Sequence, residues 1–455
     1  MEYRKNDLVT IRIEDCSTEG QGIGKADGYA VFVKDTVIGD LAEVRIVKAK
    51  KNYAYGRLEK ILEGSPWRQE PVCPVARQCG GCQLQSMKYE EQLRFKEKKV
   101  RDHLERIGGF ANLQMEPVIG MDTPYHYRNK AQFPVGRDRD GRLVAGFYAG
   151  RTHTIIKTDN CALGVSVNQD ILNRVLAHME AFSIDPYDER TGHGLIRHVL
   201  IRTAFSTGEI LVCLVVNGNR VPGEKELTAS LREIPGMTSI SLNVNRKNTN
   251  VILGDQLRIL WGNPYIVDSI GDIKYQISPL SFFQVNPLQT VQLYRKALSY
   301  AGLKGGETVW DLYCGIGTIS LFMAQKARKV LGVEIIDAAV ENARSNAALN
   351  GFSNAEFFVG KSEDVLPEQY EKTGEYADVI VVDPPRKGCD ETLLSTIIRM
   401  QPERVVYVSC DSATLARDLK YLCERGYELK KVCPVDMFPQ TVHIETIVLL
   451  QRLNS

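Results

Sequence analysis

The sequence carries almost no net charge, begins with no long apolar run and contains no internal repeat. Its 57 Lys and Arg residues against 56 Asp and Glu residues exclude an overall electrostatic attraction to nucleic acid, so any such signal must be local. The N-terminal segment MEYRKNDLVTIRIED is charged from its second residue and lacks the apolar core of a signal peptide or membrane span. We therefore expect a cytoplasmic protein without a membrane segment. Its 455 residues predict several domains.

Cysteine, in contrast, is plentiful. In a reducing compartment, eleven cysteines are expected to be thiols, metal ligands or catalytic groups rather than disulfides. Three of them, Cys73, Cys79 and Cys82, lie close together in CPVARQCGGCQLQ with the spacing C-x5-C-x2-C. Cys161, in TDNCALG, supplies a distant fourth thiolate. Four thiolates suit either a [4Fe-4S] cluster or a tetrahedral zinc ion.

The first part of the chain has the pattern of a small β-barrel. Residues 8–61 read as short alternating strands separated by glycine turns, which predicts an antiparallel barrel. Its last segment, RIVKAKKNYAYGRLEK, has six basic residues and one acidic residue, with Tyr53 and Tyr55 between them. This composition fits a surface that contacts phosphates and stacks on bases. It fits a solvated edge strand protected by lysines equally well.

The remaining sequence divides into a strand-rich part and an alternating part. After the cysteines, KYEEQLRFKEKKVRDHLERIG has the apolar spacing of a helix, and residues 125–265 are strand-rich with one helix-like stretch around NQDILNRVLAHMEAF. From about residue 285 a predicted amphipathic helix is followed by seven apolar runs that alternate with helices. This order predicts a doubly wound α/β sheet. The last two runs have no room for a helix between them, so we expect those strands to be antiparallel.

The segment VWDLYCGIGTISL predicts a strand that turns through Gly315 and Gly317 into a helix, where backbone can approach a ligand. A tight strand-to-helix turn would also explain these glycines. However, Glu334 ends the next strand at the spacing of an acid that binds ribose hydroxyls. Ser320 replaces the third glycine of a dinucleotide fingerprint, which favours a cofactor with adenosine but no pyrophosphate. Together with the seven strands, this site resembles that of class I S-adenosylmethionine-dependent methyltransferases.

Three further residues are candidates for chemistry. Asp383, in VIVVDPPRKG, lies at the ligand-binding edge of the predicted sheet, although Asp-Pro-Pro is also a good strand terminator. Cys410 directly precedes a predicted helix capped by Asp411 or Ser412, and a helix N-terminus favours a thiolate. A buried structural cysteine is the alternative. Glu445, in VHIETIVLL, is either a salt-bridged core residue or a base whose pKa is raised by burial.

Several motifs in combination give the chain a family resemblance. SFFQVN, DLYCGIGT, DPPR, SCDSATLARDL and HIETI, together with the barrel and the clustered cysteines, resemble the bacterial 23S ribosomal RNA uracil-5-methyltransferases of Gram-positive type. The resemblance implies an OB-like TRAM β-barrel in residues 1–62, a strand-rich iron-sulfur domain in residues 63–270, and a Rossmann-like methyltransferase domain in residues 271–455. It also implies that the helix at 88–108 packs on the catalytic domain, and that the protein is a monomer.

The resemblance implies a mechanism as well. Cys410 would add to C6 of a flipped-out uridine, C5 would accept the methyl group of S-adenosyl-L-methionine, and Glu445 would remove the C5 proton. By similarity, the cofactor site comprises Gln284, Tyr313, Gly315, Glu334 and Asp383. The four cysteines would hold a [4Fe-4S] cluster, with zinc as the alternative.

One departure from the family pattern and two alternative functions must be considered. Many family members have Asn-Pro after the nucleophile where this chain has Asp411 and Ser412, and a neighbouring carboxylate raises the pKa of a thiol. The alternative substrate is the T-loop of transfer RNA. The alternative from another class is a noncatalytic RNA-binding protein with this fold. Such a protein would tolerate loss of Cys410, so the intact nucleophile and base favour an enzyme.

Overall fold

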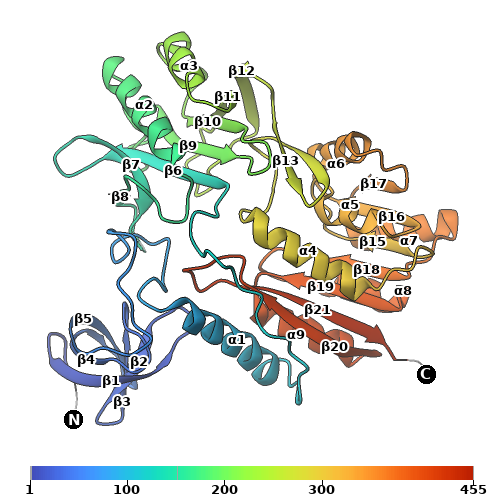
Figure 1. Cartoon of the computed structure of the whole chain (residues 1–455), viewed down its shortest axis with the longest axis horizontal. Helices are drawn as coiled ribbons and strands as arrows, with labels where there is room; N and C mark the ends of the chain where they lie inside the picture. The colour runs from blue at the N-terminus through green and yellow to red at the C-terminus, as the bar shows by residue number, and fades with distance from the viewer. Residues whose placement is uncertain (1–2, 151, 454–455) are drawn as a thin grey trace.

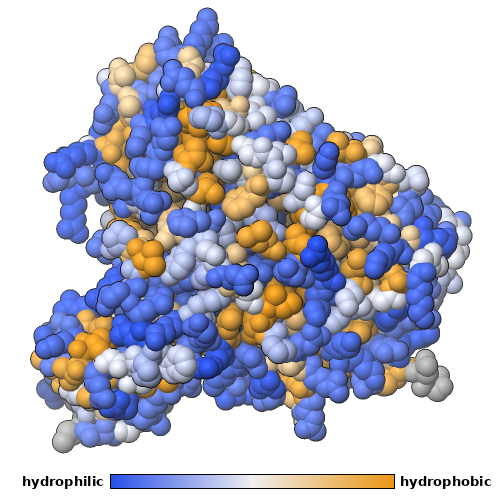
Figure 2. All heavy atoms as spheres, viewed as in Figure 1, coloured by the Kyte–Doolittle hydropathy of each residue, from blue (hydrophilic) through white to orange (hydrophobic). Residues whose placement is uncertain are grey.

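A computed structural model describes residues 3–150 and 152–453 of the chain (Figure 1). Three bodies are visible: a small barrel at the lower left, a strand-rich unit at the upper left and a larger α/β unit at the right. Figure 2 shows a notch in the surface between the barrel and the strand-rich unit, with hydrophilic residues on both of its sides.

The N-terminal strands close into a barrel with the order β1-β2-β3-β5-β4. The strands are β1 (Leu8–Cys16), β2 (Gly22–Ala26), β3 (Tyr29–Val33), β4 (Leu41–Ala49) and β5 (Tyr53–Glu63). Alternate side chains of β1 fill the interior, including Val9, Ile11 and Ile13. The predicted barrel is therefore present, but β3 and β5 pair in parallel. An odd number of strands cannot close with every neighbouring pair antiparallel, so the wholly antiparallel prediction was wrong.

The segment after the barrel leads through the cysteine cluster to α1 (Tyr89–Arg106). Val100 and Leu104 of this helix are fully buried, and they belong to the same apolar core as Leu415 and Leu419 in the C-terminal α/β unit. Figure 1 shows α1 lying beside α9 and β20, although these elements are far apart in the chain. The early helix is thus a structural part of the α/β unit.

The central unit is built on a second sheet with the order β12-β11-β10-β9-β6-β7-β8. Its strands are β6 (Lys130–Arg137), β7 (Leu143–Tyr148), β8 (Ile155–Lys157), β9 (Ile196–Thr203), β10 (Ile210–Val216), β11 (Met237–Val244) and β12 (Gln256–Gly262). The predicted helix is α2 (Val167–Ala181), and a second helix, α3 (Glu224–Arg232), crosses between the parallel strands β10 and β11. The sequence prediction missed α3 because only Leu227 and Leu231 mark its buried face.

A hairpin and a helix join the central unit to the α/β unit. β13 (Ile266–Ile270) and β14 (Ile273–Ile277) form the hairpin, which packs on the α/β core. The predicted amphipathic helix is α4 (Pro287–Ala301). Asn286 caps this helix by accepting a hydrogen bond from the Gln289 backbone, and Pro287 fits its first turn.

The C-terminal sheet has seven strands in the order β17-β16-β15-β18-β19-β21-β20. Its elements are β15 (Thr308–Asp311), α5 (Thr318–Ala324), β16 (Lys329–Glu334), α6 (Asp337–Leu349), β17 (Ala355–Val359), α7 (Ser362–Thr373), β18 (Val379–Val382), α8 (Glu391–Met400), β19 (Arg404–Ser409), α9 (Ser412–Cys423), β20 (Tyr427–Val435) and β21 (Glu445–Arg452). Helices α4, α5 and α6 pack on one face, and α1, α8 and α9 on the other. The doubly wound sheet and the antiparallel β20-β21 pair were both predicted from the sequence.

Candidate active site

The predicted reactive residues lie at one edge of the C-terminal sheet. β15, β16, β18 and β19 are parallel, so the loops that follow them meet at that edge. β21 runs antiparallel to β19 with Ser409 opposite Thr446, which places the first residue of β21, Glu445, next to Cys410. Strand topology thus brings together a thiol and a carboxyl group that the sequence separates.

The loop after β15 has the geometry of a ligand-binding turn. Gly315 and Gly317 have φ angles of +54° and +83°, in the left-handed region that favours glycine. A Cβ added to Gly315 would meet no heavy atom within 4 Å, so space is open beside this backbone. Glu334 accepts hydrogen bonds from the Gly315 backbone at 3.2 Å and from the Ile336 backbone at 3.0 Å. Its carboxylate therefore fixes the turn between β15 and α5 to the end of β16.

The other predicted cofactor residues surround this turn. Gln284 is buried in the loop before α4, where its backbone carbonyl accepts a hydrogen bond from Asn129 at 2.9 Å. Tyr313 is half-buried, and burial together with the neighbouring Cys389 raises the pKa of its hydroxyl. Tyr313 lies in the loop after β15, at the same sheet edge as Glu334, whereas Gln284 comes from the segment between β14 and α4.

Two carboxyl groups lie under the cofactor turn. Burial raises the pKa of Asp383 to about 7, and the charge of Asp311 adds to the effect. Asp311 is itself buried and has a pKa of about 6, although Ser320 donates a hydrogen bond to it at 2.6 Å. Among the described residues, its second carboxyl oxygen has no hydrogen-bond partner. Sequence analysis missed Asp311, whose only signal was its place at the end of the strand before the glycine turn.

Cys410 is half-buried between acidic groups. Burial raises the pKa of its thiol to about 12, and the charges of Glu445, Asp383 and Asp411 act in the same direction. Only Arg386 opposes them among the principal charges. The raised pKa is the outcome that the Asp411 departure from the family pattern predicted.

The backbone N–H groups at the start of α9 are not available to Cys410, because Asp411 occupies the helix N-terminus. Asp411 is the cap of α9, as predicted, and its carboxylate accepts hydrogen bonds from the backbones of Ala413 at 2.9 Å and Thr414 at 3.1 Å. These are the free N–H groups that would otherwise stabilise a thiolate. The part of the prediction that relied on unpaired N–H groups at the helix start was therefore wrong, and the pKa of the Cys410 thiol is raised rather than lowered.

Glu445 is almost fully buried at the start of β21, with 3% of its surface exposed. Burial raises its pKa well above the ordinary value, Asp383 adds to the rise and Arg386 opposes it. One of its carboxyl oxygens has no hydrogen-bond partner within residues 3–150 and 152–453. Among the described residues Glu445 forms no ion pair, so it is not a salt-bridged core residue, and its raised pKa marks it as a candidate for proton transfer.

Arg386 is a site residue that sequence analysis did not single out. It is exposed, it follows Pro384 and Pro385, and its backbone carbonyl accepts a hydrogen bond from the Thr414 side chain at 3.1 Å. This bond ties the DPPR loop to the first turn of α9. His443 faces the same cation, since burial and then Arg386 lower its pKa to about 4. His443 therefore borders the site as a neutral side chain.

The four predicted ligand cysteines approach one another from two segments. Gly80 donates a backbone hydrogen bond to Tyr148 in β7 at 3.0 Å, which holds the first segment against the central sheet near Cys161. Burial raises the pKa of Cys82 to about 12, and charges on Cys161, Cys79 and Cys73 contribute to the rise. Such mutual effects require the thiols to be neighbours.

The donors around these thiols suit an iron-sulfur cluster. The Gly81 backbone N–H donates to the Cys79 sulfur at 3.3 Å, and backbone hydrogen bonds of this kind stabilise ligating thiolates. However, within the described residues no three His, Cys, Asp or Glu side chains have an arrangement that would hold a metal ion. Four thiols with nearby hydrogen-bond donors are chemically suitable ligands for an iron-sulfur cluster. The arrangement of their side chains alone does not define a metal centre.

The basic, tyrosine-bearing segment forms one wall of the barrel. β5 pairs with both β3 and β4 and is therefore not an edge strand, whereas Lys48 lies at the end of β4, where the pairing is with β5 alone. Tyr53 packs edge-on against Phe32 and Tyr55, with both ring centroids 5.6 Å away. Lys48 and Lys51 are exposed nearby in the sequence. Aromatic rings beside exposed lysines leave the RNA-binding interpretation standing.

The fold and this sheet edge define an S-adenosylmethionine-dependent methyltransferase. The sequence profile described as tRNA (uracil-5-)-methyltransferase matches residues 88–453, and the TRAM domain profile matches residues 4–58. The chain belongs to the RNA (uracil-5-)-methyltransferase family that the first profile describes, and it carries a TRAM domain. Across the described part of the chain, no helix is long and apolar enough to cross a membrane.

Known proteins resemble the chain over nearly its whole length. An uncharacterized RNA methyltransferase of Halalkalibacterium halodurans is 52% identical over 451 residues, covering 99% of this chain and 98% of the relative. One from Clostridium tetani is 49% identical over 448 residues, covering 98% and 97%. The crystal structure of Pyrococcus abyssi tRNA (uracil-54, C5)-methyltransferase in complex with S-adenosyl-L-homocysteine has a TM-score of 0.78 at 28% identity, covering 97% of this chain and all of that one. S-adenosylmethionine is thus supported as the methyl donor.

Proposed function

We propose that this enzyme methylates C5 of uridine in 23S ribosomal RNA, with Cys410 as nucleophile and Glu445 as base. The observation that carries the proposal is the position of these two residues, side by side at the sheet edge that holds the cofactor turn. Uracil C5 alone is a poor nucleophile, so a thiol and a base in one site supply the two groups that the reaction requires.

The proposed reaction begins when the Cys410 thiolate forms a bond to C6 and the electron pair of the C5–C6 double bond is released toward C5. When bound, S-adenosylmethionine supplies an electrophilic methyl group to that carbon. Glu445 then takes the C5 proton, the C5–H electron pair re-forms the double bond, and the C6–S bond breaks to return the thiolate. A raised pKa suits Glu445 to this proton transfer near neutral pH.

We infer that five residues hold the cofactor. Glu334 would accept hydrogen bonds from the ribose, Gly315 would let the ligand approach the backbone, and Gln284, Tyr313 and Asp383 would line the rest of the site. Support comes from the open space at Gly315 and from the parallel strands that bring the loops of Tyr313, Glu334 and Asp383 to one sheet edge. The target uridine must leave its stack to reach Cys410, because the thiol is half-buried.

We further propose that Cys73, Cys79, Cys82 and Cys161 hold a [4Fe-4S] cluster rather than zinc. Their mutual effects on pKa and the N–H···S bond at Cys79 support this assignment. The cluster would make the segment between the barrel and α1 more rigid. All steps of methyl transfer described above use other residues.

The choice of ribosomal RNA depends on the TRAM barrel and the cysteine cluster, which resemble those of the ribosomal branch. Transfer RNA is the second candidate, because the Pyrococcus abyssi structure that matches this chain belongs to an enzyme for tRNA uracil 54. We propose a cytoplasmic monomer with domains 1–62, 63–270 and 271–455. The first division is proposed from the barrel strands β1 to β5, of which the last ends at Glu63.

The experiment that tests the function uses methyl-labelled S-adenosylmethionine with unmodified 23S ribosomal RNA and, in parallel, unmodified transfer RNA. Mass spectrometry then locates 5-methyluridine. Label at defined positions of 23S RNA supports the proposal, and label only in the T-loop assigns the second candidate. Cys410→Ala serves as the control: it should bind RNA and transfer no methyl group. Retained transfer by this variant would exclude the assigned nucleophile.

A further inference from the structure

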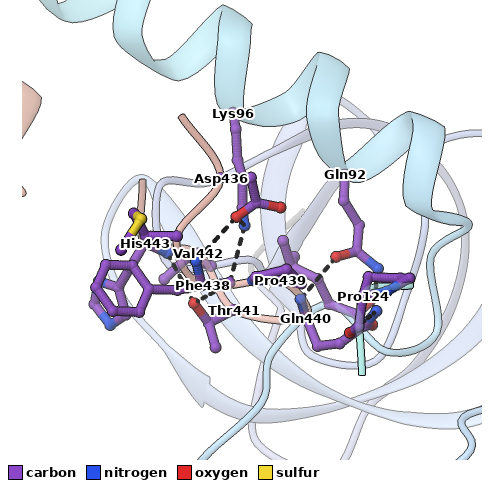
Figure 3. Close-up of polar contacts among 12 residues, drawn as sticks. Gln92, Lys96, Pro124, Asp436, Phe438, Pro439, Gln440, Thr441, Val442 and His443 are labelled. Carbon is purple, nitrogen blue, oxygen red and sulfur yellow. Dashed lines mark hydrogen bonds and ion pairs between the residues drawn. The ribbon is translucent and has the colours of Figure 1, made fainter. Parts of the chain in front are cut away.

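The segment that leads into Glu445 is held by hydrogen bonds of its own and by contacts from several distant parts of the chain. We call residues 436–444, between β20 and β21, the base loop. Its first residue, Asp436, forms a fully buried ion pair with Lys96 of α1 at 2.6 Å. Tyr89, also from α1, donates a hydrogen bond to the other Asp436 oxygen at 2.9 Å. Figure 3 shows Lys96 and Gln92 projecting from α1 toward the loop.

The middle of the base loop is held in an unusual conformation. Gln440 has a φ angle of +70°, a left-handed conformation that residues other than glycine adopt at some cost. Gln92 of α1 stabilises this conformation with two hydrogen bonds. It accepts one from the Gln440 backbone N–H at 3.0 Å and donates one to the Gln440 side chain at 2.9 Å. The Gln440 carbonyl accepts from the backbones of Gln83 at 3.1 Å and Leu84 at 3.0 Å. These two residues directly follow Cys82.

Two more parts of the molecule contact the same loop. Tyr127, from the start of the central unit, donates to the Pro439 carbonyl at 3.0 Å. Asn286, in the loop that carries Gln284, donates to the Met437 carbonyl at 3.1 Å. The base loop therefore touches α1, the cysteine segment, the central unit and the cofactor side, and it ends at Glu445.

The buried ion pair is weak evidence for a contribution to the stability of the protein. It is better evidence that the position of the base loop is specified. Burying Lys96 and Asp436 requires both to lose their water, and apolar residues of the same size would often stabilise a core equally well. Such a pair instead specifies one arrangement, because any displacement leaves a buried charge without its partner. Here the arrangement specified is that of the loop before the base.

We propose that Gln92 and Lys96 of α1 are positioning residues, which fix the base loop and so place Glu445 for removal of the C5 proton. This inference rests on the proposed function. The Gln92 amide nitrogen also lies 3.1 Å from the Leu84 carbonyl and 2.8 Å from the Met87 carbonyl, so its two hydrogens are shared among three acceptors and the side chain joins the cysteine segment to the base loop. A disturbance of that segment is thereby transmitted to the general base.

The reaction offers a readout that separates positioning from general structural support. Bond formation between Cys410 and C6, and methylation of C5, need the thiol and the cofactor. Removal of the C5 proton needs Glu445; its electron pair re-forms the C5–C6 bond and expels the Cys410 thiolate. If only Glu445 is displaced, the methylated covalent enzyme-RNA adduct accumulates. A displacement of about 1 Å slows such a step by up to about 100-fold.

The test compares Gln92→Ala with Arg94→Ala in the full-length protein. Arg94 is a matched control on the same helix, where it pairs with Glu91 and lies over the Trp67 ring. Single-turnover reactions with labelled S-adenosylmethionine and 23S RNA measure the denaturant-stable adduct and its decay. Amide hydrogen exchange measures the protection of residues 436–446 in the free proteins.

In Gln92→Ala we expect adduct decay to slow by about 10- to 100-fold with methyl transfer nearly unchanged, and residues 436–446 to exchange faster. Arg94→Ala should do neither. The proposal would be overturned if the Gln92→Ala adduct decayed at the wild-type rate or if hydrogen exchange of residues 436–446 were unchanged. It would also be overturned if cofactor binding and every reaction step were weakened equally. If Gln92→Ala does not fold, the double variant Lys96→Met/Asp436→Asn, which removes both charges of the pair, takes its place.

The two proposals fail in different ways. If the wild-type protein forms no 5-methyluridine in any RNA, the proposed function fails, while the exchange comparison still decides whether Gln92 holds the base loop. If the wild type is active and the Gln92 variant behaves like it, the function stands and the positioning role is rejected.

Discussion

The surroundings of Cys410 predict that the free enzyme has an unreactive nucleophile. The thiolate is the attacking form, and a pKa of about 12 in place of 9 lowers its fraction about 1000-fold at neutral pH. A more basic thiolate is intrinsically more reactive, by about 10^0.4 to 10^0.5 for each pKa step, or roughly 16- to 32-fold here. Cys410 should therefore react with a small disulfide reagent about 30- to 60-fold more slowly than a free cysteine.

The assay follows modification of the tryptic peptide 405–417, in which Cys410 is the single cysteine. A synthetic peptide of the same residues provides the unfolded reference. The rate in the folded protein should rise about tenfold per pH step from 7 to 10, since the thiol titrates above that range. Glu445→Gln should accelerate the reaction by removing a nearby negative charge, and Glu424→Gln, at the far end of α9, should not. A rate that levels off below pH 8, or exceeds that of the peptide, would refute this account of the site.

Three other predictions concern the rest of the molecule. Chain purified without oxygen should contain iron and acid-labile sulfide in equal amounts, and Cys161→Ala should lose both; zinc alone would contradict the cluster. Asp383 has a pKa raised from 3.8 to about 7, so its stabilising contribution is complete below pH 4 and lost as pH rises through 7. The thermal midpoint should fall over that range, less steeply in Asp383→Asn. Replacing Lys48 and Lys51 by Ala should weaken RNA binding and lower its salt dependence by about one ion per lost phosphate contact, whereas an unchanged slope would exclude the barrel from the interface.

The sequence was informative where a local pattern determines structure. Alternating apolar runs predicted the seven-stranded sheet, and the Asp411 cap of α9 was readable because capping depends on neighbouring residues. Cys410 was selected by its place at a strand end and Glu445 as a carboxylate in an apolar strand, and the strand order then brought them together. They remain predictions as catalytic groups until they are tested.

What escaped prediction depends on contacts between distant segments. Asp311 and Arg386 acquire importance from the charges around them, and no spacing in the sequence reveals those charges. Gln92 and Lys96 look like ordinary polar residues of an amphipathic helix until Gln440 and Asp436 are placed against them. The argument from the helix start for Cys410 failed for the same reason. It considered the helix but not the carboxylate that already accepts hydrogen bonds from the N–H groups at the helix start.

The packing of α1 also has a consequence for how the chain is made. Its partner residue Asp436 follows Lys96 by 340 positions, so the apolar face with Val100 and Leu104 has no final neighbour during most of translation. At about 5–20 residues per second, that interval is roughly 20–70 s. An amphipathic helix exposed for so long is a natural binding site for a ribosome-associated chaperone. The nascent enzyme should therefore depend on such protection until its last strands emerge.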